Sequence, residues 1–161
     1  PRVRSRPRGR SVRGWLLDTN VVSELARLAG AERVVAWAEG QPEHTLCISV
    51  LTLAEFDKGI AALPSDAPAR PRLEAAVRAL ETRFRGRTLT VDDAVVRCWG
   101  RISGSVKRQR GQAPPVIDTL LAATAIEHDL CLVTRNVRDV RDSGAVVFDP
   151  WTEDPPDFLR T

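Results

Sequence analysis

The chain of 161 residues contains no methionine, no tyrosine and no apolar run of membrane-spanning length. A membrane helix needs roughly 18 to 20 consecutive apolar residues, and the arginines near the N-terminus are not followed by the apolar stretch of a signal peptide. We therefore expect neither a membrane-spanning nor a secreted protein. Aromatic residues make up only 5% of the chain, so an extended base-stacking surface is not expected either.

Cysteine is scarce as well. The chain has three, Cys47, Cys98 and Cys131, and they lie far apart in the sequence. So few cysteines cannot form a disulfide-stabilised scaffold, and their odd number favours reduced thiols. We therefore expect a cytoplasmic protein.

The formal net charge of +3 is unevenly distributed along the chain. Residues 1–13 hold six arginines and no acid, which leaves 18 basic and 21 acidic residues, a net charge of about −3, for the rest. We expect residues 1–13 to be a disordered arginine-rich tail, interpreted as a tag or as a start assigned too far upstream. One folded domain is expected at 14–152, followed by a C-terminal tail at 153–161.

The pattern of apolar residues predicts strands that alternate with helices. Short apolar runs predict strands at residues 15–17, 46–49, 88–91, 131–134 and 145–148. Helical spacing predicts helices at residues 19–29, 34–38, 50–63, 73–84, 93–107 and 116–128, with a short turn at 136–140 and a loop at 65–71. This alternation is typical of an α/β fold with a mostly parallel sheet of about five strands and helices on both faces.

Several acidic residues stand where such a sheet binds ligands, at the carboxyl ends of strands. Asp18 follows the first strand, Glu55 lies near the start of the helix after the second, and Asp118 opens the helix at 116–128. Each also has a purely structural interpretation. Asp18 is a good helix cap, Thr52 to Glu55 matches a capping box, and Asp118 suits the positive end of a helix dipole.

A carboxylate at the first strand end, with no glycine-rich loop, argues against a nucleotide-binding fold. Asn136 and Asp139 add a polar cluster after the fourth strand. Carboxylates that converge in one crevice repel each other unless a cation neutralises them, and oxygen ligands select Mg²⁺ or Mn²⁺. Such a site suits hydrolysis of a phosphodiester by a metal-activated water.

At these residues the sequence resembles the PIN-domain ribonucleases, and among them the VapC and FitB-like toxins of bacterial type II toxin–antitoxin systems. The segments that carry the resemblance are LLDTNVVSEL at 16–25, ISVLTLAEF at 48–56, KGI at 58–60, GRTL at 86–89, PVIDTLLAATA at 115–125 and LVTRNVRD at 132–139. They follow the order of the family and cover the chain from Trp15 to about Trp151.

The resemblance implies a three-layer α/β/α fold and a Mg²⁺-dependent endoribonuclease of the bacterial cytoplasm, with Mn²⁺ as a substitute, that blocks translation by cutting RNA. It implies that Asp18, Glu55 and Asp118 bind metal and that Thr134 orients a carboxylate or the attacking water, with Asn20 beside them. The fourth position stays open. Some members carry aspartate where this chain has Asn136, and Asp139, one helical turn away, is the alternative acid.

The same resemblance implies partners. We expect a homodimer and a VapB-type antitoxin, in a heterotetramer or larger complex, and an arginine or lysine of the antitoxin inserted among the carboxylates. The RNA substrate, whether tRNA, rRNA or mRNA, stays open. The basic groups at 83–87 and 107–110 are interpreted as a solvated surface or as an RNA-binding rim. A non-catalytic PIN-like module that binds RNA or protein is the alternative function, because Asn136 replaces an acid.

Overall fold

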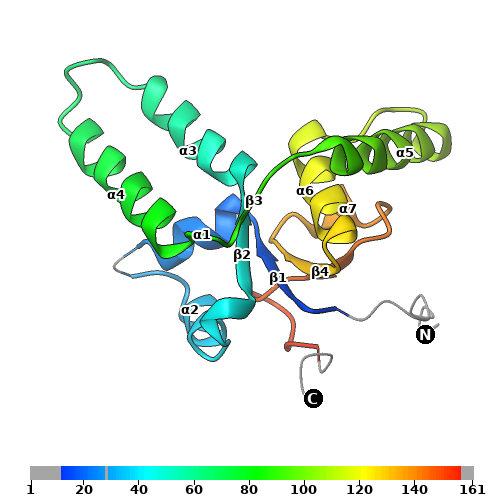
Figure 1. Cartoon of the computed structure of the whole chain (residues 1–161), viewed down its shortest axis with the longest axis horizontal. Coiled ribbons are helices and arrows are strands. Elements are labelled where there is room, and N and C mark those ends of the chain that lie inside the picture. The colour runs from blue at the N-terminus through cyan, green and yellow to red at the C-terminus, as the bar shows by residue number, and fades with distance from the viewer. Residues whose placement is uncertain (1–11, 28, 157–161) are drawn as a thin grey trace.

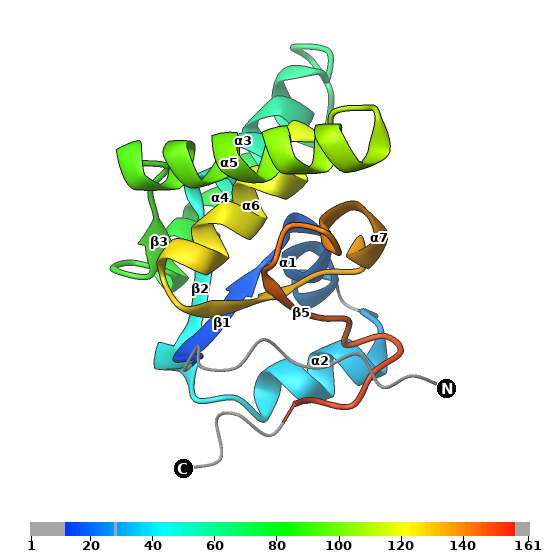
Figure 2. The same ribbon diagram turned by 90° about the vertical axis from the view of Figure 1, so that its right-hand side faces the viewer.

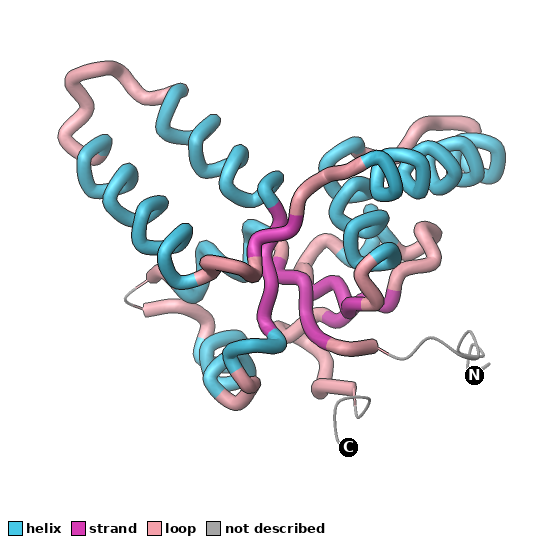
Figure 3. Tube along the Cα trace, viewed as in Figure 1, coloured by secondary structure: helices cyan, strands magenta, loops and turns pink. Residues whose placement is uncertain are grey.

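The computed structural model describes residues 12–27 and 29–156. Its centre is a five-stranded sheet in the order β3-β2-β1-β4-β5, in which every paired strand is parallel to its neighbour. The strands are β1 (Gly14–Leu17), β2 (Leu46–Ser49), β3 (Thr88–Leu89), β4 (Leu130–Val133) and β5 (Val146–Phe148). Figure 3 shows them gathered in the middle of the molecule, with helices around them. The α/β fold and the parallel five-stranded sheet are confirmed.

Helices connect the strands and form the outer layers. Within the described residues they are α1 (Thr19–Leu25), α2 (Glu32–Glu39), α3 (Val50–Ala61), α4 (Arg70–Arg83), α5 (Asp93–Arg110), α6 (Val116–Glu127) and α7 (Val137–Val140), with a 3₁₀ turn at Glu43–Thr45. Figure 1 shows α3 and α4 as an antiparallel pair that projects from one side of the sheet, while α5 and α6 lie on the other side.

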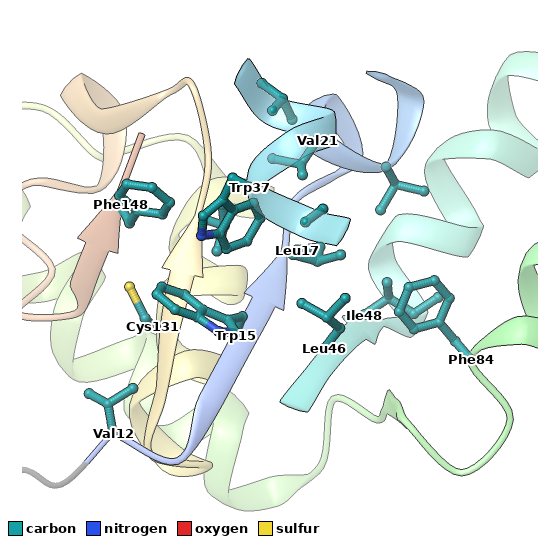
Figure 4. Close-up of a cluster of buried hydrophobic side chains, with 14 residues drawn as sticks. Val12, Trp15, Leu17, Val21, Trp37, Leu46, Ile48, Phe84, Cys131 and Phe148 are labelled. Atoms are coloured by element: carbon teal, nitrogen blue, oxygen red, sulfur yellow. The ribbon is translucent and has the colours of Figure 1, made fainter. Parts of the chain in front are cut away.

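Alternation along β1 divides the core into two layers, because successive side chains of a strand point to opposite faces. Trp15 and Leu17 pack against α1 and α2, whereas Leu16 packs against α6 and α7. On the first face, Trp15 meets the ring of Trp37 edge-on at 5.1 Å, and Phe148 lies 5.7 Å and 5.2 Å from these two rings (Figure 4). Three of the eight aromatic residues are therefore used to fix the sheet against α2.

Three predicted helix boundaries are wrong. The first helix ends at Leu25 rather than at 29, because the chain folds back over its end: Glu24 Oε2 accepts the backbone N–H of Ala31 at 2.9 Å, and Gly30 packs on the Glu24 carbonyl. A Cβ at Gly30 would lie only 2.3 Å from that carbonyl oxygen, so a glycine is required for this reversal.

The other two differences lengthen helices into predicted loops. Helix α4 begins at Arg70, inside the segment expected to be a loop, because Pro71 is tolerated in a first helical turn. Helix α5 continues to Arg110, so the basic group at 107–110 is helical. Gly111 ends it in the left-handed conformation at φ 78°, and basic side chains in a last turn interact favourably with the helix dipole.

The ends of the described chain pack on this core. Val12 is buried, two residues before the expected start of the domain, and Arg13 donates its backbone N–H to the Asp129 carbonyl at 2.8 Å. Arg33 of α2 donates to the Glu153 carbonyl at 2.7 Å and to Asp154 at 2.8 Å. Most of the arginine-rich segment lies outside the described residues, so its disorder stays a prediction. Among the described helices, none combines the length and apolarity that a membrane span requires.

Candidate active site

The strand order creates a crevice at the carboxyl end of β1. This strand is flanked by β2 on one side and by β4 on the other, so the connections from it and from its neighbour β4 run to opposite sides of the sheet. The place where the strand order reverses in this way is called the switch point, and ligands bind there in open α/β sheets. Asp18 follows β1 and Thr134 follows β4. Asp18 donates its backbone N–H to the Val133 carbonyl at 3.0 Å, and Thr134 Oγ1 donates to Asp18 Oδ2 at 2.6 Å.

Asp18 is both a helix cap and a buried carboxylate. Its Oδ1 accepts the backbone N–H of Thr19 at 2.6 Å, which satisfies the first turn of α1. Its Oδ2 accepts a second donor besides Thr134, the Asn20 side-chain amide, also at 2.6 Å. Only 5% of Asp18 is exposed. Three short hydrogen bonds therefore fix this carboxylate in one orientation.

Glu55 lies in the second turn of α3. The helix begins at Val50, and its cap is Ser49, whose hydroxyl accepts the Leu51 N–H at 3.2 Å. The capping-box interpretation of Glu55 is therefore wrong, because a residue in the second turn cannot satisfy the first N–H groups. Its Oε2 instead accepts the hydroxyl of Thr19 from α1. This hydrogen bond holds the Glu55 side chain beside the start of α1, at the switch point.

Asp118 is placed by the first turn of α6. Its neighbour Thr119 is buried, bonds through Oγ1 to the Pro115 carbonyl at 2.6 Å, and accepts Trp99 Nε1 of α5 at 3.1 Å. These bonds fix the start of α6 against α5. The half-buried Asp118 accepts the Asn136 side-chain amide on Oδ1 at 3.2 Å.

Asn136, and not Asp139, stands beside the carboxylates. The Asn136 backbone N–H donates to Thr134 Oγ1 at 2.9 Å, so the Thr134 hydroxyl connects Asp18 with the chain leading to α7. Asp139 donates its backbone N–H to the Asn136 carbonyl at 3.0 Å but does not line the pocket described next. An amide therefore stands beside the carboxylates at this position, and the acid three residues on lies outside the pocket.

These side chains surround one cavity of about 320 Å³. Its lining residues are Asp18, Thr19, Asn20, Ser23, Glu55, Ile117, Asp118 and Asn136. The three acids and two asparagines named from the sequence thus converge, with Thr134 directly behind them. Sequence reasoning missed Thr19 and Ser23. Their spacing of four residues on α1 puts them on one helix face, and this spacing after Asp18 is the signal that could have found them.

The environment of Asp18 raises the pKa of its carboxyl group. The pKa of Asp18 lies above its ordinary value of 3.8, chiefly because burial disfavours the charge, and the nearby Asp118 and Glu55 raise it further. Hydrogen bonds from Thr134 and from the Thr19 N–H act in the opposite direction. The pocket is therefore an anionic site that lacks a counter-charge from its own lining residues.

The donor set fits a hard divalent cation. Carboxylate and amide oxygens are ligands that Mg²⁺ and Mn²⁺ prefer, and a cation would relieve the repulsion that raises the pKa of Asp18. Within residues 12–27 and 29–156, however, no three acidic, histidine or cysteine side chains already stand in a metal-binding arrangement. The carboxylates share a pocket, and a cation would have to draw them closer together.

Comparison with known proteins assigns the fold to a family. The profile described as "PIN domain" matches residues 15–141. This chain belongs to the PIN-domain family. Among curated relatives, this PIN domain is 33% identical over 136 residues to Toxin FitB of Neisseria gonorrhoeae, covering 84% of this chain and 97% of that one. It is 32% identical over 139 residues to VapC ribonuclease Y4jK of Sinorhizobium fredii, covering 84% and 96%.

A solved structure agrees with this assignment. The crystal structure of FitAcB from Neisseria gonorrhoeae superimposes on this PIN domain with a TM-score of 0.77 at 32% identity, covering 86% of this chain and 99% of that one. The agreement over nearly the whole length of that chain confirms the three-layer α/β/α architecture.

Arg87, which belongs to the basic group at 83–87, has a structural role in the fold. Arg87 donates to the Glu43 and Leu46 carbonyls, each at 2.8 Å, pairs with the Glu43 carboxylate at 2.8 Å, and lies 4.8 Å from the centre of the Phe84 ring. It joins the start of β2 to the end of α4. This structural role leaves little of the guanidinium available for RNA.

The raised pKa of Asp18 predicts how metal-free stability depends on pH. The folded state keeps the Asp18 proton to a higher pH than the unfolded chain does. The contribution of Asp18 to the free energy of unfolding therefore falls as the pH rises from about 3.8 through the pKa of the folded state, and it is constant at higher pH. Urea unfolding of wild type and Asp18→Asn at a series of pH values measures this. The free energy of unfolding of wild type, relative to the variant, should fall as the pH rises through this window.

Thr134→Val provides the matched comparison. It removes the donor that favours the ionised carboxylate, so the loss of stability should extend to higher pH than in wild type. If the free energy of unfolding of wild type, relative to Asp18→Asn, increased with pH in this window, the assignment of a raised pKa to Asp18 would be contradicted.

Proposed function

We propose that this PIN domain is the toxin of a toxin–antitoxin pair, a Mg²⁺-dependent endoribonuclease that cuts RNA and so inhibits translation. The observation that supports this most is the convergence of Asp18, Glu55 and Asp118, from three separate segments, on one pocket at the switch point. Two curated relatives carry the names toxin and ribonuclease.

In this proposal Asp18, Asp118 and Glu55 hold the metal, and Mn²⁺ substitutes for Mg²⁺. When bound, the ion polarises a phosphate and lowers the pKa of a water that attacks phosphorus. Asp18 is pre-oriented for this role by donors from Thr134, Asn20 and the Thr19 backbone. Such pre-orientation reduces the reorganisation needed in the transition state.

The other lining residues position these acids. Asn136 donates its amide to Asp118, which leaves only its neutral carbonyl oxygen to offer as a ligand. Thr19 donates to Glu55 and lies on the first turn of α1. The proposal therefore assigns metal binding to three acids and gives the fourth position to an amide.

The experiment that tests the function is RNA cleavage by purified wild type, Asp18→Asn and Asp118→Asn in Mg²⁺. Metal assistance supplies several kcal/mol of transition-state stabilisation, so each substitution should slow cleavage at least about a hundredfold. Sequencing of RNA 5′ ends after expression of wild type beside Asp118→Asn would identify the RNA that is cut. Asp57→Asn, an exposed acid on the same helix as Glu55, is the matched control and should retain cleavage.

Three outcomes have distinct meanings. Cleavage that persists in both pocket variants would refute the assignment of the site. RNA binding by wild type without turnover at any Mg²⁺ or Mn²⁺ concentration would favour the alternative, a non-catalytic binding module. Asp139→Asn separates the two candidates for the fourth position, because its loss of activity would return Asp139 to the site, whereas unchanged cleavage leaves that position to Asn136.

We also propose that the chain forms a homodimer and binds a VapB-type antitoxin in a heterotetramer or larger complex. Val96 of α5 and Val116 of α6 are apolar side chains that are 45% and 54% exposed, and contact with a second copy would cover them. The anionic pocket suits an arginine or lysine from the antitoxin, which would pair with the carboxylates and displace metal. Support for the antitoxin comes from the toxin name of the relative at 33% identity.

Light scattering and a co-crystal structure test this assembly. The mass at micromolar concentration should be that of two chains, and the antitoxin should contact Asp18 or Asp118. A monomer mass would contradict the homodimer, and a partner bound wholly away from these acids would contradict the inhibition mechanism.

A further inference from the structure

Three exposed arginines follow the pocket along the chain. Arg138 lies within α7, and Arg135 and Arg141 lie just before and just after it, so the three arginines are spaced three residues apart along this segment. Within the part of the chain that the structure describes, none of them has a carboxylate oxygen within 4 Å. Eight other described arginines form ion pairs, whereas these three keep their charge without a carboxylate partner at that distance.

The first of the three is attached to the pocket. Arg135 lies between Thr134 and Asn136, and its backbone N–H donates to Asn20 Oδ1 at 3.3 Å. The same Asn20 side chain donates to Asp18. Figure 2 shows β1 pointing towards the end of the sheet where α1 and α7 lie. The arginines therefore begin at the rim of the pocket and continue away from it.

The Arg135 side chain is held in place by an aromatic ring. Its guanidinium carbon lies 4.5 Å from the centre of the Trp151 ring, and Trp151 is itself fixed by its backbone N–H, which donates to Asp149 Oδ1 at 2.9 Å. A stacked guanidinium keeps its charge and its donors while losing part of its rotamer freedom in advance. It is thus prepared to bind an anion at a reduced entropic cost.

The nearby acids are mostly engaged by other groups. Glu24 interacts electrostatically with Arg135, but its carboxylate already accepts hydrogen bonds from Arg27 and from the Ala31 N–H. Asp142 is paired with Arg110, and Asp139 is half-buried. Both oxygens of Asp149 accept hydrogen bonds, from the Trp151 N–H and the Thr152 hydroxyl. The surface around α7 therefore keeps a positive charge directly beside an anionic pocket.

We propose that Arg135, Arg138 and Arg141 form the surface that binds the RNA backbone on one side of the scissile phosphate. An RNA that reaches the three carboxylates meets repulsion, and cations beside the pocket offset it by neutralising phosphates. Because the contacts are to phosphates, they fix the path of the strand and not its sequence. This inference rests on the proposed ribonuclease function, since it concerns the approach of RNA to that pocket.

The test is the salt dependence of RNA binding. A fluorescently labelled single-stranded RNA of about 20 nucleotides and mixed sequence is titrated with protein in EDTA, which prevents cleavage, at about 50 to 200 mM KCl. Each phosphate contact on a single strand contributes about −0.7 to the slope of log K against log salt concentration. The triple variant Arg135→Gln, Arg138→Gln, Arg141→Gln should therefore reduce the magnitude of the slope by about 2 and weaken binding at low salt on the order of tenfold or more.

A control removes positive charge at another place on the molecule. Arg72 and Arg78 on α4 are also exposed and unpaired within the described residues, and they lie outside the basic group at 83–87. Their double glutamine variant should keep the wild-type slope. An equal loss of slope for each charge removed in the two variants, or a larger loss in the α4 variant, would overturn the inference, provided that wild type binds RNA. Wild type that binds no RNA at any salt concentration would instead refute the proposed function itself.

Circular dichroism melts check that the variants fold. Arg138→Gln alone, at an exposed side chain without a described contact, offers a second measurement and should reduce the slope by about 0.7. Arg135→Lys keeps the charge but weakens stacking on Trp151, so it should keep the slope and lower the affinity. Loss of slope in Arg135→Lys, or an unchanged slope in Arg138→Gln, would contradict the phosphate contacts assigned to these side chains.

Discussion

Burial of the Asp18 carboxylate beside two further carboxylates is the constraint on which the rest of this structure depends. Asp18 is almost fully removed from water and shares a pocket with Glu55 and Asp118. Burial of a charge without a partner is costly, and the three donors around Asp18 compensate only part of that cost, because its pKa is still raised. On the proposed function, this cost in metal-free stability is offset when a cation binds between the carboxylates.

The surrounding fold brings the acids together from distant parts of the chain. The parallel sheet places the ends of β1 and β4 side by side, so that Asp18 and Thr134, 116 residues apart, form a hydrogen bond. Trp99 and Thr119 then lock the start of α6, which carries Asp118, onto α5. The aromatic cluster of Trp15, Trp37 and Phe148 fixes the opposite face. Positive charge around α7 completes the site by facing the phosphates of the proposed substrate.

Much of this arrangement is predictable from the sequence because hydrophobic period and strand order constrain it. The runs at Leu16 and Leu132 predict buried strands, and the carboxyl ends of parallel strands lie at one edge of the sheet, so Asp18 and Thr134 are expected at the same edge. That their two strands are adjacent is seen only in the structure. The role of Glu55 depends on where α3 begins. A start at Leu53 would make Glu55 part of a capping box, whereas the start at Val50, which the sequence favours because it directly follows the second strand, places Glu55 in the second turn. The fourth position stayed open because Asn136 and Asp139 differ only in how α7 is oriented. Helix ends set by tertiary contact, such as that of Glu24 with Ala31, leave no local signal.

A crystal structure with Mn²⁺, located by its anomalous scattering, tests the central claim most directly. The account predicts one strong peak inside the pocket, bound by oxygens of Asp18 and Asp118 with Glu55 close by, and no peak at this place in crystals of Asp118→Asn grown under the same conditions. Crystals of wild type that bind Mn²⁺ only elsewhere, or that leave the three carboxylates in an empty pocket at millimolar Mn²⁺, would contradict it.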